Sequence, residues 1–193
     1  CGLVPMSEPY QKRTSHGMVL GEGGEKMSKS RGNVINPDDV VDEFGADVFR
    51  MYEMFIGPFD QSAAWDTKGI SGIHRFINKV WRLVKESDIQ SGEIPDNQQF
   101  IVNNTIKKVT EQIDSLDMNT AISQLMIMIN EISKENAINK AVMETFLKML
   151  APFAPHVSEE LWHSLGNKDI IAFEDWPQYD EKHLIQNTII IPI

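Results

Sequence analysis

Two lysines and an arginine, Lys26, Lys29 and Arg31, lie within six positions of one another, beside serine and methionine side chains. Three glycines precede these cations and Gly32 follows them. Mobile cations next to open backbone N–H groups can hold the phosphates of a nucleotide while negative charge moves among them. Glycines on both sides would let such a loop move. Residues 21–33 are therefore predicted to be a phosphate-binding loop.

Two well-known phosphate-binding motifs do not fit this loop. A Walker loop needs four residues between its two glycines, but only two residues separate Gly21 from Gly24. It also needs serine or threonine after its lysine, where this chain has Met27. A dinucleotide fingerprint that starts at Gly21 would require a glycine at the position of Lys26. Both motifs are excluded.

Residues 26–30 read KMSKS, and this run resembles the KMSKS loop of class I aminoacyl-tRNA synthetases. Residues 52–58 read YEMFIGP, which is more similar to leucyl-tRNA synthetases than to the valyl, isoleucyl or methionyl enzymes. Further along, residues 150–156 (LAPFAPH), 159–162 (EELW) and 174–177 (EDWP) resemble a helix and turn shared by the leucyl, valyl and isoleucyl enzymes. The chain therefore resembles a C-terminal fragment of leucyl-tRNA synthetase over nearly its whole length.

The resemblance implies that the loop binds ATP with Mg²⁺ in the parent enzyme. Lys26 and Lys29 would have catalytic roles, holding the triphosphate while the leucine carboxylate attacks the α-phosphorus and pyrophosphate leaves. Lys29 would make the main transition-state contact, and Arg31 would brace the loop. The ATP-binding residues expected from the motif are Lys26, Met27, Ser28, Lys29 and Ser30. The alternative interpretation is a basic surface turn without a ligand.

Composition limits the classes of protein to which the chain can belong. With 193 residues and 41% hydrophobic content, it can bury a sizeable core. No run approaches the roughly 20 apolar residues of a membrane helix, so no membrane association is expected. A single cysteine, Cys1, excludes an internal disulfide and a cysteine-based zinc site, so we expect no metal site and a cytoplasmic location. A chain that starts at Cys1 and stops at Ile193 is expected to be a piece of a longer protein.

The net charge of −10 argues against a simple nucleic-acid-binding protein, but the positive charge is unevenly distributed. Residues 1–33 hold five Lys/Arg against three Asp/Glu, and residues 67–85 hold five against none. The rest of the chain is strongly acidic. Two basic segments are therefore separated by acidic sequence.

The elements that position the loop can be read from apolar spacing and helix caps. Residues 17–20 form a short apolar run that predicts a strand leading into the loop. Asn36, followed by proline and two aspartates, predicts the start of a short helix that ends at Gly45. A second helix is predicted over residues 46–55 and would end at the Gly-Pro pair that follows.

A long amphipathic helix is predicted next, with Thr67 or Ser71 as its cap. Its apolar residues recur at helical spacing and include Trp81, which is expected in the core. Its opposite side is basic, and we expect it to bind tRNA through Arg75, Lys79, Arg82 and Lys85. An ordinary solvated helix face is the alternative.

Further helices are predicted over residues 98–116, from Asp117 or Asn119 onward, from Asn139 to Leu150, and from Pro155 to Leu165. Residues 170–173 and 189–191 look extended. The fold class expected is mainly α: an up-and-down bundle of four or five helices behind a small mixed segment. The resemblance implies that this small segment is the edge of a Rossmann-type catalytic domain followed by a stem-contact region. In the family this bundle is the anticodon-binding domain. The predicted division is catalytic edge with the loop (1–33), stem-contact region (34–66), helical bundle (67–168) and C-terminal extended segment (169–193).

The resemblance implies a monomeric parent enzyme that activates leucine with ATP and transfers it to tRNA(Leu). The sequence has no HIGH-type motif and no threonine-rich editing segment. We therefore expect this chain alone to bind no ATP and to be inactive, since ATP and leucine would also need the other half of the site. Two alternatives stay open: a valyl, isoleucyl or methionyl synthetase fragment, or a non-enzymatic helical module that binds RNA or protein.

Overall fold

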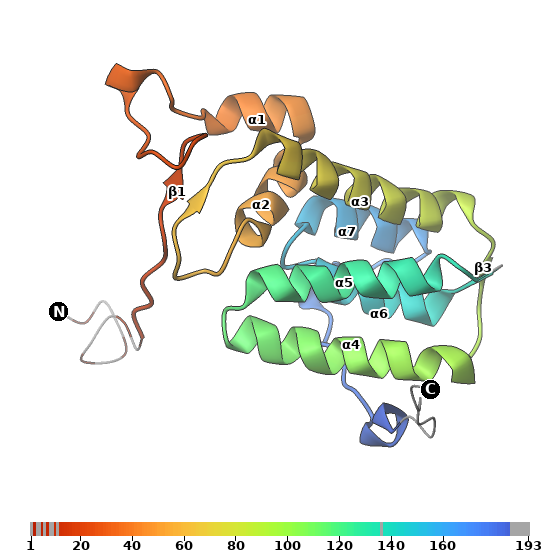
Figure 1. The fold of residues 1–193 in the computed structure, drawn as a ribbon. Helices are drawn as coiled ribbons and strands as arrows, with labels where there is room; N and C mark the ends of the chain where they lie inside the picture. The colour runs from red at the N-terminus through yellow and green to blue at the C-terminus, as the bar shows by residue number, and fades with distance from the viewer. Residues whose placement is uncertain are drawn as a thin grey trace, which may run out of the picture.

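The computed structural model describes residues 12–135 and 137–185, together with Gly2, Pro5, Ser7 and Tyr10. Within this part of the chain seven α-helices are joined by short connections, with two pairs of two-residue strands. A small N-terminal region with the loop lies at one end, and the helices stack in layers beside it (Figure 1). The fold is mainly α, as predicted. None of the described helices is both long enough and apolar enough to cross a lipid bilayer.

The predicted strand before the loop is present as β1 (Val19–Leu20), which pairs in parallel with β2 (Ala63–Ala64). Gly17 lies just before β1, and its N–H donates to the carbonyl oxygen of Phe59 at 2.8 Å. A Cβ atom on Gly17 would lie 1.8 Å from the carbonyl oxygen of Gln61, so only glycine allows this close approach. The chain therefore enters the loop from a fixed strand.

Helices α1 (Pro37–Phe44) and α2 (Ala46–Phe55) follow the loop, with the caps that the sequence predicts. The side chain of Asn36 accepts a hydrogen bond from the Asp38 N–H at 3.3 Å. Gly45 has a φ of 89°, which separates the two helices. Met51 and Tyr52 of α2 are buried and join this region to the bundle core.

The bundle consists of α3 (Thr67–Glu86), α4 (Asp96–Asp114), α5 (Met118–Ile132), α6 (Lys140–Leu150) and α7 (Pro155–Ser164). Each turns its apolar side inward, and one continuous core of buried residues runs through all five. The caps predicted for α3 and α5 differ from those in the structure. Asp66, not Thr67 or Ser71, caps α3 by accepting from the Lys68 N–H at 3.0 Å, and Asp117 precedes α5 without a side-chain cap.

The sequence did not predict the contact that joins two interhelical connections. β3 (Ile89–Gln90) pairs in parallel with β4 (Ile138–Asn139) across 49 positions of chain. Asn139 accepts from the Val142 N–H at 3.2 Å, as the predicted cap of α6, and donates to the Glu93 carbonyl at 2.9 Å. The polar connection between α3 and α4 is thus fixed to the start of α6.

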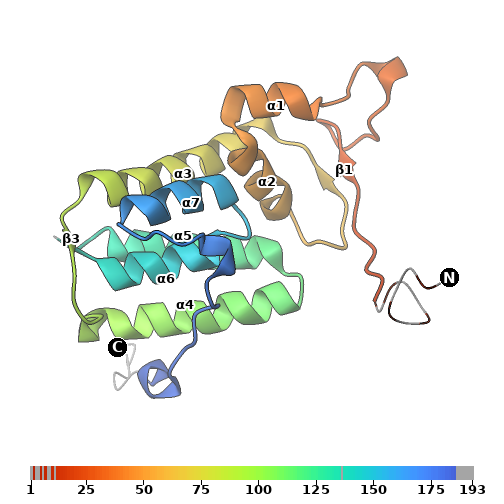
Figure 2. The same cartoon turned by 180° about the vertical axis from the view of Figure 1, so that it is seen from behind.

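The extended run predicted at residues 170–173 is wrong for Ile171–Phe173, while residues 174–180 form no helix. Residues Ile171–Phe173 form the 3-10 helix η2, and Glu181–Leu184 form a second one, η3. The segment crosses the bundle and ends against α4 (Figure 2). Side chains of the bundle hold it, because the Trp176 indole donates to Thr110 Oγ1 at 2.8 Å. The predicted extended run 189–191 lies outside the described residues.

Candidate functional site

Residues 21–33 form a loop that projects from the end of β1, away from the helical bundle (Figure 1). Its neck is closed by backbone hydrogen bonds: Gly21 N–H donates to the Glu25 carbonyl at 2.8 Å, and Gly24 N–H to the Gly21 carbonyl at 3.0 Å. Gly23 and Gly24 have φ values of 86° and 80°, a conformation that other residues adopt only with strain. The glycines predicted to flank a mobile loop thus form its first turn.

Asn33 organises the inside of the loop. Its Oδ1 accepts from the Ser28 N–H at 2.8 Å, and its Nδ2 donates to the Lys26 carbonyl at 3.3 Å. One amide side chain therefore holds the backbone on both sides of Met27, whose side chain is half-buried against the core. Nothing in the local sequence predicts this role of Asn33, apart from its position just after the KMSKS run.

Lys26 and Lys29 are both exposed, and neither forms an ion pair with any described residue. Arg31 behaves differently, because its Nη1 contacts Glu25 Oε2 at 2.8 Å across the loop. Ser28 Oγ and Ser30 Oγ lie 2.8 Å apart. The arginine is thus positioned to brace the loop, while the two ammonium groups point into solvent, where a polyanion could reach them.

The base of the loop contacts the start of α3. Thr67 Oγ1 donates to Glu22 Oε1 at 2.7 Å and accepts from the Trp65 indole at 3.2 Å. Next to it, the Tyr52 hydroxyl accepts from the Asp66 N–H at 2.9 Å and donates to the Asp66 carbonyl at 2.7 Å. Burial, together with the carboxylates of Asp66 and Glu22, raises the pKa of Tyr52, so its phenol stays neutral and keeps donating. The hydrogen bond between Glu22 and Thr67, which are 45 positions apart, therefore fixes the base of the loop to the start of α3.

The four basic residues expected to bind tRNA all lie on α3. Figure 1 shows the position of this helix in the bundle. Arg75 and Arg82 are exposed, and Lys79 Nζ donates to Asn130 Oδ1 of α5 at 2.8 Å. Lys85 Nζ lies 3.7 Å from Glu160 Oε1 of α7. The helix therefore presents a basic stripe, defined here as Arg75, Lys79, Arg82 and Lys85, with its members partly tied to α5 and α7.

The assignment of Trp81 to the core is wrong. Its side chain is 38% exposed, and the Lys85 ammonium lies 5.2 Å from its ring centroid. Trp81 occupies the border of the apolar side of α3, where Ile77, Val80 and Val84 are buried. Trp81 follows the helical spacing of the apolar residues, but this spacing does not show whether a neighbouring helix covers the side chain.

A buried carboxylate that the sequence did not reveal joins α2 to α7. Asp47, with a side chain only 6% exposed, accepts from the Val157 N–H at 2.7 Å and contacts His156 Nδ1 at 2.7 Å. The residue that precedes α7, Ala154, has no side chain able to cap it. Asp47 therefore caps α7 from a distant part of the chain.

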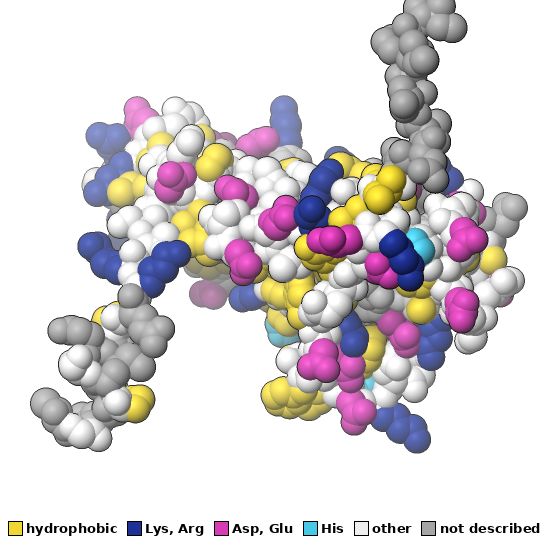
Figure 3. Space-filling view, turned by 90° about the horizontal axis from the view of Figure 1, so that it is seen from below, with side chains coloured by type: hydrophobic (Ala, Val, Ile, Leu, Met, Phe, Trp, Pro, Cys, Tyr) yellow, Lys and Arg dark blue, Asp and Glu magenta, His cyan; other side chains and the backbone are white. Residues whose placement is uncertain are grey.

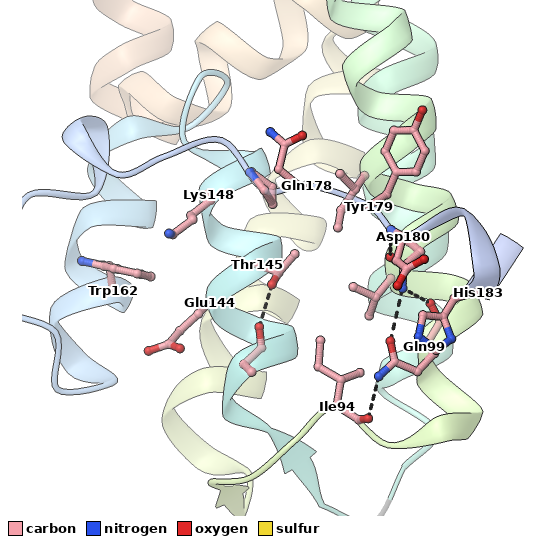
Figure 4. Close-up of a pocket in the computed structure, with 15 residues that line it drawn as sticks. Ile94, Gln99, Glu144, Thr145, Lys148, Trp162, Gln178, Tyr179, Asp180 and His183 are labelled. Atoms are coloured by element: carbon pink, nitrogen blue, oxygen red, sulfur yellow. Dashed lines mark hydrogen bonds between the residues drawn. The ribbon is translucent and has the colours of Figure 1, made fainter.

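A hollow of about 630 Å³ lies between α4, α6 and the C-terminal segment (Figure 4). Its polar groups are mostly paired with one another: Asn103 accepts from the Asp180 N–H at 2.7 Å, and Gln99 donates to the Ile94 carbonyl at 2.9 Å. Its lysine, Lys148, pairs with Glu174 at 2.8 Å. The hollow offers no group of available cations, so it does not compete with the loop as a phosphate site.

Figure 3 shows the distribution of charge on one face of the molecule. Lysine and arginine side chains gather at the left end of this view, while acidic and basic side chains mix over the rest of the face. Among the described residues, no group of three or more histidine, cysteine, aspartate or glutamate side chains could hold a metal ion.

Two family matches cover most of the chain. Residues 4–66 match the family described as "tRNA synthetases class I (I, L, M and V)", and residues 101–191 match "Anticodon-binding domain of tRNA ligase". The loop lies in the first match and most of the bundle in the second. The chain belongs to the class I aminoacyl-tRNA synthetases.

Solved structures of this class are similar to the chain. The agnB2 LeuRS of Agrobacterium radiobacter K84, solved as a ternary complex with tRNA and LeuAMS, is 29% identical with a TM-score of 0.77. That match covers 88% of this chain and 24% of the LeuRS chain. Methionyl-tRNA synthetase of Mycobacterium tuberculosis, solved with methionyl-adenylate, is 18% identical with a TM-score of 0.58 and shares the fold, over 76% of this chain and 36% of its own. The chain thus spans about a quarter of the LeuRS chain.

Proposed function

We propose that this chain is part of a leucine–tRNA ligase, which activates leucine with ATP and transfers it to tRNA(Leu). The observation that carries the proposal is the match to a LeuRS over 88% of the chain, at higher identity and TM-score than the match to the methionyl enzyme. The YEMFIGP run at residues 52–58 supports the same choice, and in the structure it contributes Tyr52 to the base of the loop.

The loop would act on the triphosphate of ATP, with Mg²⁺ as the accompanying ion. Lys26 and Lys29 are exposed and not paired with described residues, so they can approach phosphate oxygens without breaking an internal contact. Positioned ammonium groups stabilise the negative charge that builds up on the departing pyrophosphate, and they need not transfer protons. Asn33 and the Arg31–Glu25 pair would keep the loop in shape as it moves.

The helical bundle would contact tRNA(Leu) through the basic stripe. Its four bases lie on one helix of a chain whose net charge is −10, and cations grouped in this way attract the phosphate backbone of RNA. Residues 1–193 contain no HIGH-type motif, so in this proposal they do not activate leucine by themselves. The monomeric, cytoplasmic parent implied by the resemblance is part of the same proposal.

The amino-acid dependence of ATP–pyrophosphate exchange tests the leucine assignment. The full-length enzyme should exchange label between pyrophosphate and ATP with leucine, and at least about a hundredfold less efficiently with methionine or valine. Exchange that depends on valine, isoleucine or methionine instead would assign the chain to another class I synthetase. No exchange with any amino acid would favour the non-enzymatic helical module.

Binding of tRNA to the 193-residue chain tests the second part of the proposal. Affinity should fall steeply as salt rises, because each phosphate contact releases counterions. Neutralising the whole stripe (Arg75→Gln, Lys79→Gln, Arg82→Gln, Lys85→Gln) should weaken binding and flatten the salt dependence. Lys108→Gln, a change at an exposed lysine of α4, is the matched control. Binding that ignores salt, or is equally weakened by the control, would contradict a role for the stripe.

A further inference from the structure

Trp81 differs from the other tryptophans of the chain in how it is held. The indole N–H groups of Trp65, Trp162 and Trp176 donate to Thr67 Oγ1, the Asp169 carbonyl and Thr110 Oγ1, respectively. Within the described residues, the Trp81 N–H has no such acceptor. The residue is 38% exposed, at the border between the apolar side of α3 and the basic stripe, next to Lys85. An indole that is neither buried nor anchored contributes little to the stability of the bundle.

The only cation over the Trp81 ring among the described residues is Lys85, at 5.2 Å from the centroid. The same ammonium group is 3.7 Å from Glu160 Oε1, which is a long contact whose glutamate is 62% exposed. Cation–π contacts and ion pairs at exposed sites are both weak. Lys85 can therefore leave the ring for a phosphate oxygen at little cost, and its departure would uncover the ring face.

The cations beside Trp81 define the chemistry of its partner. Arg82 follows it directly, and Arg75 and Lys79 lie on the preceding turns of α3, so that the stripe spans about 15 Å along the helix. A partner that suits this surface carries several negative charges and a flat ring. A nucleotide strand has both, because its phosphates can contact the stripe while a base stacks on the indole. The bases of a duplex stack on one another, so the nucleotide that stacks here must be unpaired.

We infer that Trp81, with Arg82 and Lys85, forms a stacking platform for an unpaired nucleotide of the bound tRNA. The base lies against the indole ring, and the adjoining phosphates replace Glu160 and the ring as partners of Lys85. This inference rests on the proposed tRNA binding and adds to it a contact that charge alone does not provide. It explains why a tryptophan is left exposed on a helix whose other large apolar residues are mostly buried.

The test is binding of a tRNA transcript to the 193-residue chain, measured at several salt concentrations. Trp81→Ala should weaken binding by roughly five- to a hundredfold and leave the salt slope unchanged, because stacking involves no counterion release. Trp81→Phe should retain most of the affinity, since a smaller ring still stacks. Binding of RNA should quench tryptophan emission in the wild-type chain, and much of this quenching should be lost in Trp81→Phe.

Tyr179→Ala is the matched control, because Tyr179 is also a partly exposed aromatic residue with a lysine, Lys107, 5.9 Å from its ring. It lies on the C-terminal segment, away from α3, and its removal should not change RNA affinity. A blunt RNA duplex without unpaired nucleotides should bind wild type and Trp81→Ala equally.

Two results would overturn the platform. One is an unchanged tRNA affinity in Trp81→Ala; the other is an equal loss of affinity for tRNA, for the duplex and for a non-nucleic polyanion such as heparin. If the neutralised stripe still loses binding in the same experiment, the proposed tRNA contact survives and only the stacking inference fails. If the neutralised stripe binds as wild type does, both fail together.

Discussion

The side chain of Asp47 links α2, which lies behind the loop, to the start of α7. Its carboxylate caps α7 and contacts His156, although about 110 positions of chain separate the partners. We expect Asp47→Ala to lower the free energy of unfolding by about 1–3 kcal/mol, because a helix cap is lost and the partly buried Val157 N–H loses its acceptor. Denaturant unfolding measures this loss.

Asp42→Ala is the matched control for Asp47, since Asp42 is an exposed aspartate on the neighbouring helix α1. It should change the free energy of unfolding by less than about 0.5 kcal/mol. Equal effects of the two substitutions would show that the long-range cap contributes nothing. Asp47→Asn should lie between wild type and Asp47→Ala, because the amide oxygen can still accept from Val157.

Glu53 gives a pH-dependent prediction. Partial desolvation of its carboxyl group raises the pKa of Glu53, although the residue is largely exposed, and nearby Arg50 opposes the shift only in part. The folded state then holds the proton more tightly than the unfolded state, so stability is lost as pH rises from the unfolded value of about 4.5 through the folded pKa. Glu53→Gln should therefore raise Tm at pH 7 and not at pH 4. The gain should be about 1 °C, since the exposed side chain is screened by water.

The pH dependence separates this effect from a general gain in packing. Glu111→Gln, at an exposed glutamate of α4, should leave Tm unchanged at both pH values. A gain in Glu53→Gln of the same size at pH 4 and pH 7 would contradict an origin in the raised pKa.

Local motifs identified some of the candidate residues and gave no sign of others. The spacing of Lys26 and Lys29 within the KMSKS run predicted an accessible pair of lysines, and the structure exposes both. The contact of Glu22 with Thr67 and the cap by Asp47 could not be predicted, because they join residues 45 and 110 positions apart without any local pattern. Trp81 was misassigned because helical spacing identifies the apolar side of a helix but not where its neighbours stop covering it.

At the scale of elements, the loop depends on Asn33. Its side chain holds the Ser28 N–H and the Lys26 carbonyl. Asn33→Ala should speed hydrogen exchange at Ser28 by roughly two- to tenfold, which corresponds to the usual net value of one hydrogen bond. Asn104→Ala, at a half-buried asparagine of α4, should leave that exchange rate unchanged. Unaltered exchange at Ser28 in Asn33→Ala would show that the loop keeps its shape without this side chain.

Caps and breakers predicted the elements better than apolar runs did. Asn36, Gly45, Asn139 and Pro155 each mark a boundary that the structure confirms, because each has a backbone or side-chain property specific to a helix end. The run at residues 170–173 carries no such signal. Its expected extended form is absent because side chains of the bundle hold that segment, and no strand pairs with it.

For the whole molecule, helical spacing predicted a bundle but not how its connections are joined. The β3–β4 pair and the path of residues 169–185 across α4 and α6 arise from contacts between distant parts of the chain. The loop is fixed at its base to α3 by the Glu22–Thr67 hydrogen bond, and α3 carries the basic stripe. The two proposed sites, for ATP and for tRNA, thus share one structural support.

The most direct test of the account is ATP–pyrophosphate exchange by the full-length enzyme carrying Lys29→Ala, with Lys108→Ala as the control. If the exposed ammonium of Lys29 stabilises the departing pyrophosphate, the exchange rate should fall by about 10²- to 10³-fold in Lys29→Ala and stay unchanged in the control. Circular dichroism should show the same helix content in both variants. An exchange rate in Lys29→Ala equal to that of wild type would contradict the central claim that this loop acts on ATP.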